Sequence, residues 1–322
     1  MRVLITDSAH PLLQSGLEQR GYACDYRPDT TDAEVRAGIG PYAGLVVNSK
    51  ILVDRDLLDR APQLRWVMRL GSGLEIIDLG YAAERGVAVL SSPEGNCDAV
   101  AEHALGMLLS LANHFCRADR EVRSRTWARE KNRGFELMGK TLGIWGFGHT
   151  GGALGRKLAG LGVRVLAYDK YKPAGYASDC PHVEECGPEA IFAEADIVSL
   201  HLPLTGETKH LADAAFFRRF ARPIVLVNTS RGAVVDTVAL VEALEQGLLA
   251  GACLDVFENE RPETYTEEES VLYERLFALE NTVLTPHVAG WTHESKRKLS
   301  EVLLKKLDGL AEKNFAFPRS NA

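Results

Sequence analysis

Three polar residues whose types suit a single reaction follow separate apolar runs in the last third of the chain. IVLVNTS leads into Arg231, GACLDVFEN into Glu260 and TVLTP into His287. An arginine can hold a carboxylate through two parallel hydrogen bonds, and a histidine can exchange a proton with a hydroxyl or carbonyl oxygen near neutral pH. A carboxylate beside that histidine fixes its tautomer and favours its protonated form. The three residues together predict the interconversion of a 2-hydroxy acid and its 2-keto acid.

Each of these residues also has an ordinary interpretation. Arg231 could cap a surface turn, Glu260 lies in the acidic run ENERPETYTEEE, and His287 could be a packed loop residue after a proline. Their shared position at strand ends favours the functional interpretation, because the carboxyl ends of parallel strands line the ligand crevice of a doubly wound sheet.

A glycine motif marks a second site of chemical interest. Gly146, Gly148 and Gly151 form GFGHTG, which directly follows the run TLGIWGF and precedes the helical pattern GGALGRKLAGLG. The first glycine permits a tight turn, the second lets the backbone approach a pyrophosphate, and the third lets the helix pack on the strand. The helix N-terminus then faces the anionic phosphates. The motif predicts a dinucleotide, although a glycine-rich turn that binds nothing is the alternative.

The next apolar run, RVLAYDK, brings in an acid at the position that selects between dinucleotides. Asp169 can accept hydrogen bonds from the adenosine ribose hydroxyls and would repel a 2′-phosphate, so NAD is favoured over NADP. Lys170 and Lys172 leave that preference open, because either could turn toward a phosphate.

Short runs rich in Val, Ile and Leu alternate with helical patterns along the chain and form two series. The first comprises residues 2–7, 23–28, 44–49, 64–71 and 87–92, and the second comprises residues 141–147, 164–170, 196–202, 224–230, 251–256 and 282–287. Such βα alternation predicts an α/β protein with two doubly wound parallel sheets, one Rossmann-like and one flavodoxin-like, with a cleft between the domains.

Two long helical patterns set the expected domain boundaries. Residues 97–115 repeat apolar positions at helical spacing and should bridge the two lobes, and residues 293–313 should return to the first lobe. We expect a discontinuous substrate-binding domain of residues 1–97 plus 288–322, and an NAD-binding domain of residues 98–287. The stretch 264–281 looks like an added short helix.

Composition narrows the class of partner. The 322 residues include 37 basic and 44 acidic residues, which give a net charge of -7, and 46% are hydrophobic. This acidic balance argues against a nucleic acid and against an anionic membrane surface, and it favours a small-molecule partner. The N-terminus lacks the features of a signal peptide, and the apolar stretch Ala104 to Ala112 is too short for a membrane span, so we expect a cytoplasmic protein.

The six cysteines form no CxxC pair, which is typical of a chain whose thiols stay reduced. Cys180, His182 and Cys186 are of residue types that bind zinc, but zinc ligands normally show tighter paired spacing. We therefore expect no metal site.

In this order the motifs resemble those of the D-isomer-specific 2-hydroxyacid dehydrogenase family. The resemblance lies in GFGHTG, Asp169, NTSRG at 228–232, LDVFENE at 254–260 and TPHVAGWT at 285–292. RLGSGLEIIDLGYAAERGV and SSPEGNCDAVAEHALGMLL look like the family's substrate-domain loop and hinge helix. Within the family, the chain looks most similar to the short phosphoglycerate dehydrogenases, which lack a regulatory domain.

The resemblance implies roles for the residues already chosen: Arg231 anchors the substrate carboxylate, His287 is the acid/base, and Glu260 is its partner. It places further residues on the cofactor side: His149 and Thr150 at the pyrophosphate, His201 and Leu202 at the adenine, Thr229, and Asp255 at the nicotinamide carboxamide. It places on the substrate side Asn48, Lys50, Leu70, Gly71, Ser72, Gly73 and Asn96.

The substrate expected first is 3-phosphoglycerate, as in serine biosynthesis, with an unphosphorylated acid such as glycerate or D-lactate as the alternative. Lys50, Arg69 and Arg261 could face a distal phosphate. Against this, Asn48 stands where many family members carry Arg. Arg261 also separates Glu260 from Pro262, whereas many members have the proline directly after the glutamate.

The family further implies a homodimer that buries apolar residues such as Leu105, Leu108 and Leu109, which could equally be intramolecular core. Two other functions use the same fold: an NAD-sensing corepressor scaffold, and a dehydrogenase of formate or phosphite.

Overall fold

The computed structural model describes residues 1–312 of the chain, with the side chains of residues 1–310. The chain forms two compact units. Among the described residues, unit 1 comprises residues 1–97 together with residues 291–312, and unit 2 comprises Asp98–Gly290. The second boundary lies at Gly290 rather than at the expected residue 287, because the main-chain N–H of Ala289 donates to the carboxylate of Asp255 and ties that segment to unit 2.

Unit 1 is built on a five-stranded sheet in which all neighbouring strands are parallel. The order is β2-β1-β3-β4-β5, which is the flavodoxin-like arrangement. The strands are β1 Arg2–Ile5, β2 Ala23–Tyr26, β3 Tyr42–Val47, β4 Trp66–Arg69 and β5 Ala88–Leu90. All six residues of β3 are buried, as expected for a central strand of a sheet covered on both faces.

The helices of unit 1 begin where the sequence supplies a capping side chain. They are α1 Pro11–Gln19, α2 Asp32–Gly38, α3 Arg55–Arg60 and α4 Leu79–Glu84. Thr31 and Glu34 form a capping box at α2, and the carboxylates of Asp54 and Asp78 accept main-chain N–H groups at the starts of α3 and α4.

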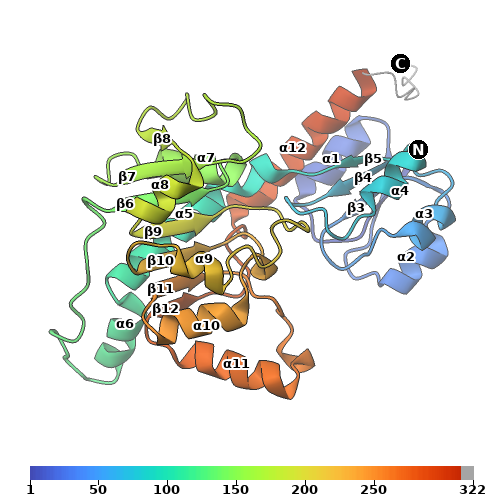
Figure 1. The fold of residues 1–322 in the computed structure, drawn as a ribbon. Coiled ribbons are helices and arrows are strands. Elements are labelled where there is room, and N and C mark those ends of the chain that lie inside the picture. The colour runs from blue at the N-terminus through green and yellow to red at the C-terminus, as the bar shows by residue number, and fades with distance from the viewer. Residues whose placement is uncertain (313–322) are drawn as a thin grey trace. The chain divides into compact units, whose positions relative to one another are not determined.

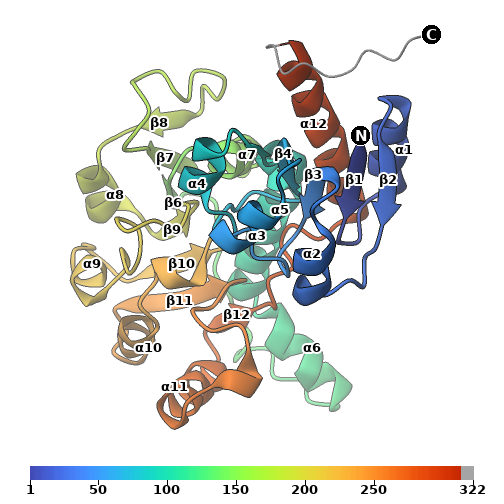
Figure 2. The same cartoon turned by 90° about the vertical axis from the view of Figure 1, so that its right-hand side faces the viewer.

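The helix expected near the C-terminus is α12, His293–Glu312, and its expected last residue, 313, lies outside the described residues. It lies beside α1 in unit 1 (Figures 1 and 2). Gly16 allows this close packing, because a Cβ there would come within 2.4 Å of Leu304 Cδ1. The guanidinium of Arg20 donates to Asp308 at 2.6 Å.

Unit 2 contains a seven-stranded sheet, again with every neighbouring pair parallel. The order is β12-β11-β10-β9-β6-β7-β8, so the strand order reverses between β6 and β9, where such sheets bind their ligands. The strands are β6 Thr141–Trp145, β7 Arg164–Tyr168, β8 Val183–Glu185, β9 Ile197–Leu200, β10 Ile224–Asn228, β11 Leu249–Leu254 and β12 Thr282–Leu284.

The fold class is confirmed, but the structure differs from three sequence-based predictions. Six strands were expected in the second sheet, and β8 makes a seventh. The bridging helix α5 is Pro93–Ala112, not 97–115; Pro93 suits a first helical turn, and His114 takes a left-handed φ of 52°. A separate helix, α6 Phe115–Arg123, then follows without a single buried residue.

The remaining helices of unit 2, except the first of them, pack around one apolar core. They are α7 His149–Lys157, α8 Pro188–Glu194, α9 Ala214–Arg218, α10 Thr237–Glu245 and α11 Glu267–Ala278, the last within the stretch expected to add a helix. Trp145, Phe192 and Phe216 meet edge to face in this core, and Leu240 of α10 and Leu276 of α11 are buried in the same cluster. The core therefore anchors the helices that flank the candidate site.

Among the described residues, no helix is both long and apolar enough to cross a membrane.

Candidate active site

His287 and Glu260 form a hydrogen-bonded pair, as the sequence predicts. His287 Nδ1 lies 2.8 Å from Glu260 Oε2, although the two residues are 27 positions apart. Burial alone would raise the pKa of Glu260, but the hydrogen bond and charge of His287, the main-chain N–H of Phe257 and the charge of Arg231 outweigh it, so the pKa lies below its usual value. Glu260 is therefore an anion at neutral pH and can stabilise a positive charge on the imidazole.

The segment that carries His287 is held by the buried carboxylate of Asp255. Asp255 accepts hydrogen bonds from Thr285 Oγ1 at 2.6 Å and from the main-chain N–H groups of Val288 and Ala289 at 2.9 Å each. His287 itself takes a left-handed φ of 55°, and its N–H donates to the Asp255 carbonyl at 2.7 Å. A non-glycine residue keeps such a backbone only when its surroundings enforce it, and Asp255 supplies that constraint.

This network reaches α5 through a second histidine. His103 Nε2 lies 3.0 Å from Thr285 Oγ1. The Thr285 hydroxyl has a single proton, which it donates to Asp255, so His103 Nε2 must be the donor to Thr285. The loop that carries the acid/base is thus tied both to β11 and to α5.

Arg231 lies in a turn that Asn228 organises at the end of β10. Asn228 Oδ1 accepts from the N–H and Oγ of Ser230, and Asn228 Nδ2 donates to the Arg231 carbonyl at 3.0 Å. Arg231 Nη1 donates to the Ser230 carbonyl at 2.6 Å. Because the charge of Arg231 also lowers the pKa of Glu260, the three expected catalytic residues share one electrostatic environment.

The glycine motif has the geometry of a dinucleotide loop. Gly146 has a φ of +94°, and a Cβ there would lie 2.4 Å from the His201 carbonyl oxygen. A Cβ on Gly151 would lie 2.1 Å from the Gly146 carbonyl oxygen, whereas one on Gly148 would meet nothing within 4 Å. Gly148 begins α7 without a side-chain cap, so the exposed first turn, with His149 and Thr150, offers its N–H groups to an anion.

Asp169 holds the glycine loop and is flanked by lysines that are bound elsewhere. Its carboxylate accepts from the N–H groups of Phe147 at 2.9 Å and Tyr171 at 3.1 Å. Lys170 Nζ donates to Glu207 at 3.0 Å, and Lys172 Nζ donates to the Phe147 carbonyl at 2.6 Å. Both lysines are therefore bound to other acceptors, and neither is placed to bind a 2′-phosphate. This arrangement fits NAD.

Two buried polar atoms, one directly after β9 and one directly after β10, have no hydrogen-bond partner among the described residues: His201 Nδ1 and Thr229 Oγ1. Burial lowers the pKa of His201 to about 4, so its ring is neutral, and its Nε2 lies 2.9 Å from Ser199 Oγ. Leu202 lines the same turn, since its Cδ2 would lie 3.0 Å from a Cβ on Gly146. Buried polar atoms without a protein partner at the carboxyl ends of these strands fit a cofactor that would bond them, so these residues fit a dinucleotide.

The expected substrate residues lie in unit 1. Leu70, Gly71, Ser72 and Gly73 follow β4, and the Ser72 hydroxyl donates to Asn96 Oδ1 at 3.1 Å. The structure thus brings together the loop after β4 and the start of α5.

Asn48 and Lys50 follow the neighbouring strand, β3. The Asn48 N–H donates to Asp7 at 2.9 Å, and Lys50 Nζ donates to the Pro28 carbonyl. These two residues are bonded to other parts of unit 1 and not to the loop after β4.

The cysteine-rich connector does not gather a metal site in the part of the chain that the structure describes. Within residues 1–312, no group of three His, Cys, Asp or Glu side chains could hold a metal ion. His182 Nε2 is hydrogen-bonded to the Gly155 carbonyl at 2.7 Å, while Cys180 is buried.

Several residues that support the site were not found from the sequence. Thr285 and His103 are 182 positions apart, and nothing in the sequence connects them. Glu258 was overlooked within ENERPETYTEEE, although its spacing from Glu260 in a loop after a buried strand was a usable signal.

Comparisons with known proteins identify the family of the chain. The sequence profile described as "D-isomer specific 2-hydroxyacid dehydrogenase, NAD binding domain" matches residues 105–289. A hydroxypyruvate reductase of Thermotoga maritima is 36% identical over 263 residues, which are 82% of this chain and 83% of the relative. A D-3-phosphoglycerate dehydrogenase of Archaeoglobus fulgidus is 30% identical over 97% of this chain and 58% of its own length.

Among solved structures, a D-lactate dehydrogenase of Aquifex aeolicus complexed with NAD and lactic acid superposes with a TM-score of 0.82. It is 26% identical, and the match covers 98% of this chain and 96% of that one.

Proposed function

Because the chain belongs to the D-isomer-specific 2-hydroxyacid dehydrogenase family and is an NAD-dependent oxidoreductase, we propose that it reduces a small unphosphorylated 2-keto acid such as hydroxypyruvate or glyoxylate. The observation that carries the catalytic assignment is the His287–Glu260 pair, 2.8 Å apart, in the electrostatic field of Arg231. The overall reaction converts the keto acid, NADH and one proton into the D-2-hydroxy acid and NAD.

In this mechanism, Arg231 binds the substrate carboxylate through its planar guanidinium and so orients the C2 carbonyl. When bound, NADH would supply the hydride for C2. Glu260 occupies His287 Nδ1, so Nε2 is the nitrogen that gives its proton to the carbonyl oxygen, and in oxidation it takes that proton back. Gly146, Gly148, Gly151, His149 and Thr150 would hold the pyrophosphate, with Asp169 at the adenosine ribose.

The choice of an unphosphorylated acid is supported by the relatives and by the cations of unit 1. The hydroxypyruvate and glyoxylate reductases are 36% and 38% identical over about four fifths of this chain. Two of the cations expected to face a distal phosphate have other acceptors: Lys50 donates to the Pro28 carbonyl, and Arg69 donates to the Leu70 carbonyl at 3.0 Å. The second candidate is 3-phosphoglycerate, favoured by the relative that matches 97% of this chain.

A substrate panel distinguishes the two candidates. We expect NADH oxidation with hydroxypyruvate and glyoxylate at a higher kcat/KM than with 3-phosphohydroxypyruvate, and no effect of Lys50→Ala. A preference for the phosphorylated acid that collapses in Lys50→Ala would establish the second candidate instead. Formate and phosphite with NAD complete the panel.

His287→Ala tests the catalytic assignment itself. We expect kcat to fall by about 10² to 10⁴, the usual contribution of general acid/base catalysis, while NADH binding is unchanged. Near wild-type turnover in this variant would exclude His287 as the acid/base. A wild-type protein that binds NADH but turns over none of these acids would instead favour a sensing scaffold.

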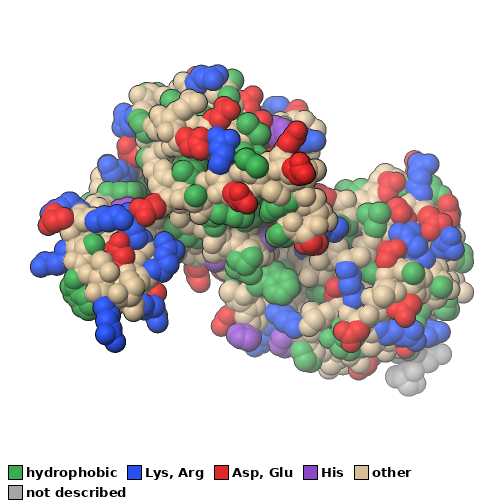
Figure 3. Space-filling model, turned by 90° about the horizontal axis from the view of Figure 1, so that it is seen from below, with side chains coloured by type: hydrophobic (Ala, Val, Ile, Leu, Met, Phe, Trp, Pro, Cys, Tyr) green, Lys and Arg blue, Asp and Glu red, His purple; other side chains and the backbone are tan. Residues whose placement is uncertain are grey.

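We also infer a homodimer formed by unit 2. Leu108 is buried within its own chain, so it belongs to the intramolecular core, whereas Leu105 and Leu109 are only partly buried. The region after α5 offers a better surface, because Trp127 and Met138 are 73% and 72% exposed. α6 and the segment after it lie at the left edge of Figure 1, and Figure 3 shows that part of unit 2 as a projecting lobe. Exposed large apolar residues on a projecting element are typical of a subunit interface.

A cytoplasmic location is part of the same proposal. All six cysteines are free, as expected in a reducing compartment.

A further inference from the structure

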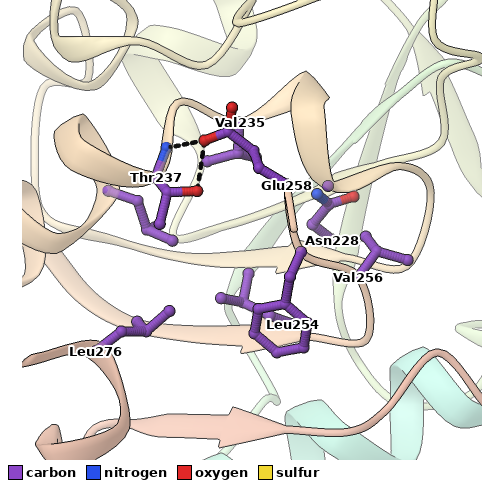
Figure 4. A pocket seen from close by; sticks show the side chains of 10 residues that line it. Asn228, Val235, Thr237, Leu254, Val256, Glu258 and Leu276 are labelled. Carbon is purple, nitrogen blue, oxygen red and sulfur yellow. Dashed lines mark hydrogen bonds between the residues drawn. The ribbon is translucent and has the colours of Figure 1, made fainter. Parts of the chain in front are cut away.

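Glu258 makes hydrogen bonds to residues outside the catalytic set of Arg231, Glu260 and His287. Its Oε2 accepts from both the N–H of Thr237, at 2.8 Å, and the Thr237 hydroxyl, at 2.5 Å. Figure 4 shows the carboxylate turned toward Thr237 beside a small pocket whose other walls include Leu254 and Leu276. Thr237 is the first residue of α10, and only 28% of the Glu258 side chain is exposed. Glu258 therefore connects its loop to a helix rooted in the core of unit 2.

The other carboxylate oxygen of Glu258 binds a histidine from a third segment. Glu258 Oε1 lies 2.5 Å from His210 Nε2. His210 has a left-handed φ of 52°, and its N–H donates to the Ala233 carbonyl at 2.8 Å. The segment before α9 is thus bonded to the turn after Arg231 and to the loop that contains Glu258.

Gly232 brings the Arg231 turn against the same loop. A Cβ at Gly232 would lie 1.9 Å from the carbonyl carbon and oxygen of Phe257 and 2.6 Å from the Glu258 nitrogen. Only a glycine permits this approach of one backbone to the other. Gly232 therefore packs directly on Phe257 and Glu258, the two residues before Asn259.

Asn259 is held from the opposite direction by α11. Its N–H donates to the Tyr273 hydroxyl at 3.0 Å, and its Nδ2 lies 3.3 Å from Glu269 Oε1. Successive residues of the loop are thus bound to α10, to α11 and to His287. Since consecutive Cα atoms are about 3.8 Å apart, two fixed residues leave the third little freedom.

We propose that Glu258 is a positioning residue for the catalytic carboxylate: by binding Thr237 and His210, it fixes the loop so that Glu260 meets His287 while Arg231 stays in register. This inference rests on the proposed roles of Glu260, His287 and Arg231. Glu258 does not touch the reacting atoms, and its effect on the reaction passes through Glu260.

The test compares Glu258→Ala with Glu258→Gln in the full-length protein. A displacement of a catalytic group by about 1 Å can cost on the order of 10²-fold in rate, so we expect Glu258→Ala to lower kcat/KM for the keto acid by about 10- to 100-fold. The Kd of NADH, measured by fluorescence, should not change. Glu258→Gln keeps an acceptor for Thr237 and should stay within about threefold of wild type.

The pH profile separates positioning from a loss of stability. Without the contact between Glu260 and His287, keto-acid reduction should decline at lower pH in Glu258→Ala than in wild type. Asp213→Ala is the matched control, because Asp213 caps α9 through the Phe216 N–H at 2.8 Å in the same core. We expect this control to lower the melting temperature without moving the pH profile.

Thr237→Val removes the hydroxyl at the other end of the contact and keeps the inference testable if Glu258→Ala does not fold. It should move the pH profile in the same direction by a smaller amount. The inference is overturned if wild type turns over the keto acid and Glu258→Ala keeps the wild-type kcat/KM and pH profile. Thr237→Val takes the place of Glu258→Ala in this comparison if that variant does not fold. The inference is also overturned if Asp213→Ala reproduces the losses. A wild-type protein without turnover would refute the proposed function instead.

Discussion

At the scale of single residues, the Glu260 carboxylate supplies a charge to His287 as well as a hydrogen-bond acceptor. Its depressed pKa means that the carboxylate is ionised across the neutral range. Keto-acid reduction needs a protonated His287, and hydroxy-acid oxidation needs an unprotonated one. The two directions of the reaction should therefore respond oppositely to removal of that charge.

Glu260→Gln keeps a hydrogen-bond partner but removes the charge. We expect the rate of keto-acid reduction to fall off at lower pH than in wild type, and hydroxy-acid oxidation to persist to lower pH. The two side chains are 48% and 38% exposed, and exposed ion pairs contribute up to about 1 kcal/mol, so the displacement of the pH profile should be small. Rate profiles in both directions measure it, and coincident profiles for variant and wild type would show that the pair does not operate.

Asp169 acts on the cofactor rather than on the substrate. Asp169→Ala removes an acceptor for the ribose hydroxyls and also the acceptor of the Phe147 N–H in the glycine loop. Hydrogen bonds to a charged group contribute about 1.5 to 3 kcal/mol, so the Kd of NADH should rise by at least about tenfold. The preference over NADPH should narrow, because the repelling charge is gone. Titration of both nucleotides measures this, and an unchanged NADH affinity would contradict it.

Among the elements, α11 supports the catalytic loop, although its sequence is acidic and largely exposed. Tyr273 is 2% exposed, and its hydroxyl accepts the N–H of the residue before Glu260. The helix begins at a capping box of Thr266 and Glu269, and the same Glu269 also binds the Asn259 side chain. The added helix thus links the core of unit 2 to the catalytic loop.

Tyr273→Phe removes that acceptor while preserving the ring. The N–H of Asn259 is partly buried and would lose its partner, at a cost of up to about 3 kcal/mol, so we expect a lower melting temperature together with a several-fold loss of kcat/KM. Tyr42→Phe is the control. The Tyr42 hydroxyl donates to Asp25 at 2.6 Å, and Tyr42 belongs to unit 1, whereas the catalytic loop belongs to unit 2. Equal losses of kcat/KM in both variants would show that α11 does not specifically support the catalytic loop.

At the scale of the whole molecule, the proposed dimer depends on the exposed apolar side chains that follow α6. Trp127→Glu places a charge where a subunit interface would exclude water, which is costly without a partner. We expect the mass in solution, measured by light scattering, to fall from that of two chains to that of one. Val271→Glu, at a residue 59% exposed on α11, should leave the mass unchanged. A wild-type protein that is already monomeric at micromolar concentration would refute the dimer.

Elements that depend on local interactions could be predicted from the sequence. Buried strands such as β3 and β10 show as continuous apolar runs, and the glycine motif with Asp169 follows β6 and β7 at a spacing that the βαβ unit imposes. Arg231, Glu260 and His287 could be chosen because each follows a recognisable strand. β8 and α6 could not: β8 is three residues long and includes Glu184 and Glu185, and α6 buries no residue that could create an apolar period.

The meeting of particular loops could not be predicted, because it depends on the packing of the whole fold. The contacts of Glu260 with His287, of His103 with Thr285 and of Glu258 with His210 and Thr237 join residues between 21 and 182 positions apart. Their hydrogen bonds depend on the order of parallel strands and on the packing of α5, α10 and α11, and a polar residue in a loop carries no periodic signal that names its partner. For the same reason Glu258 and Glu260 look equivalent in the sequence, and only the fold turns one toward a helix and the other toward the acid/base.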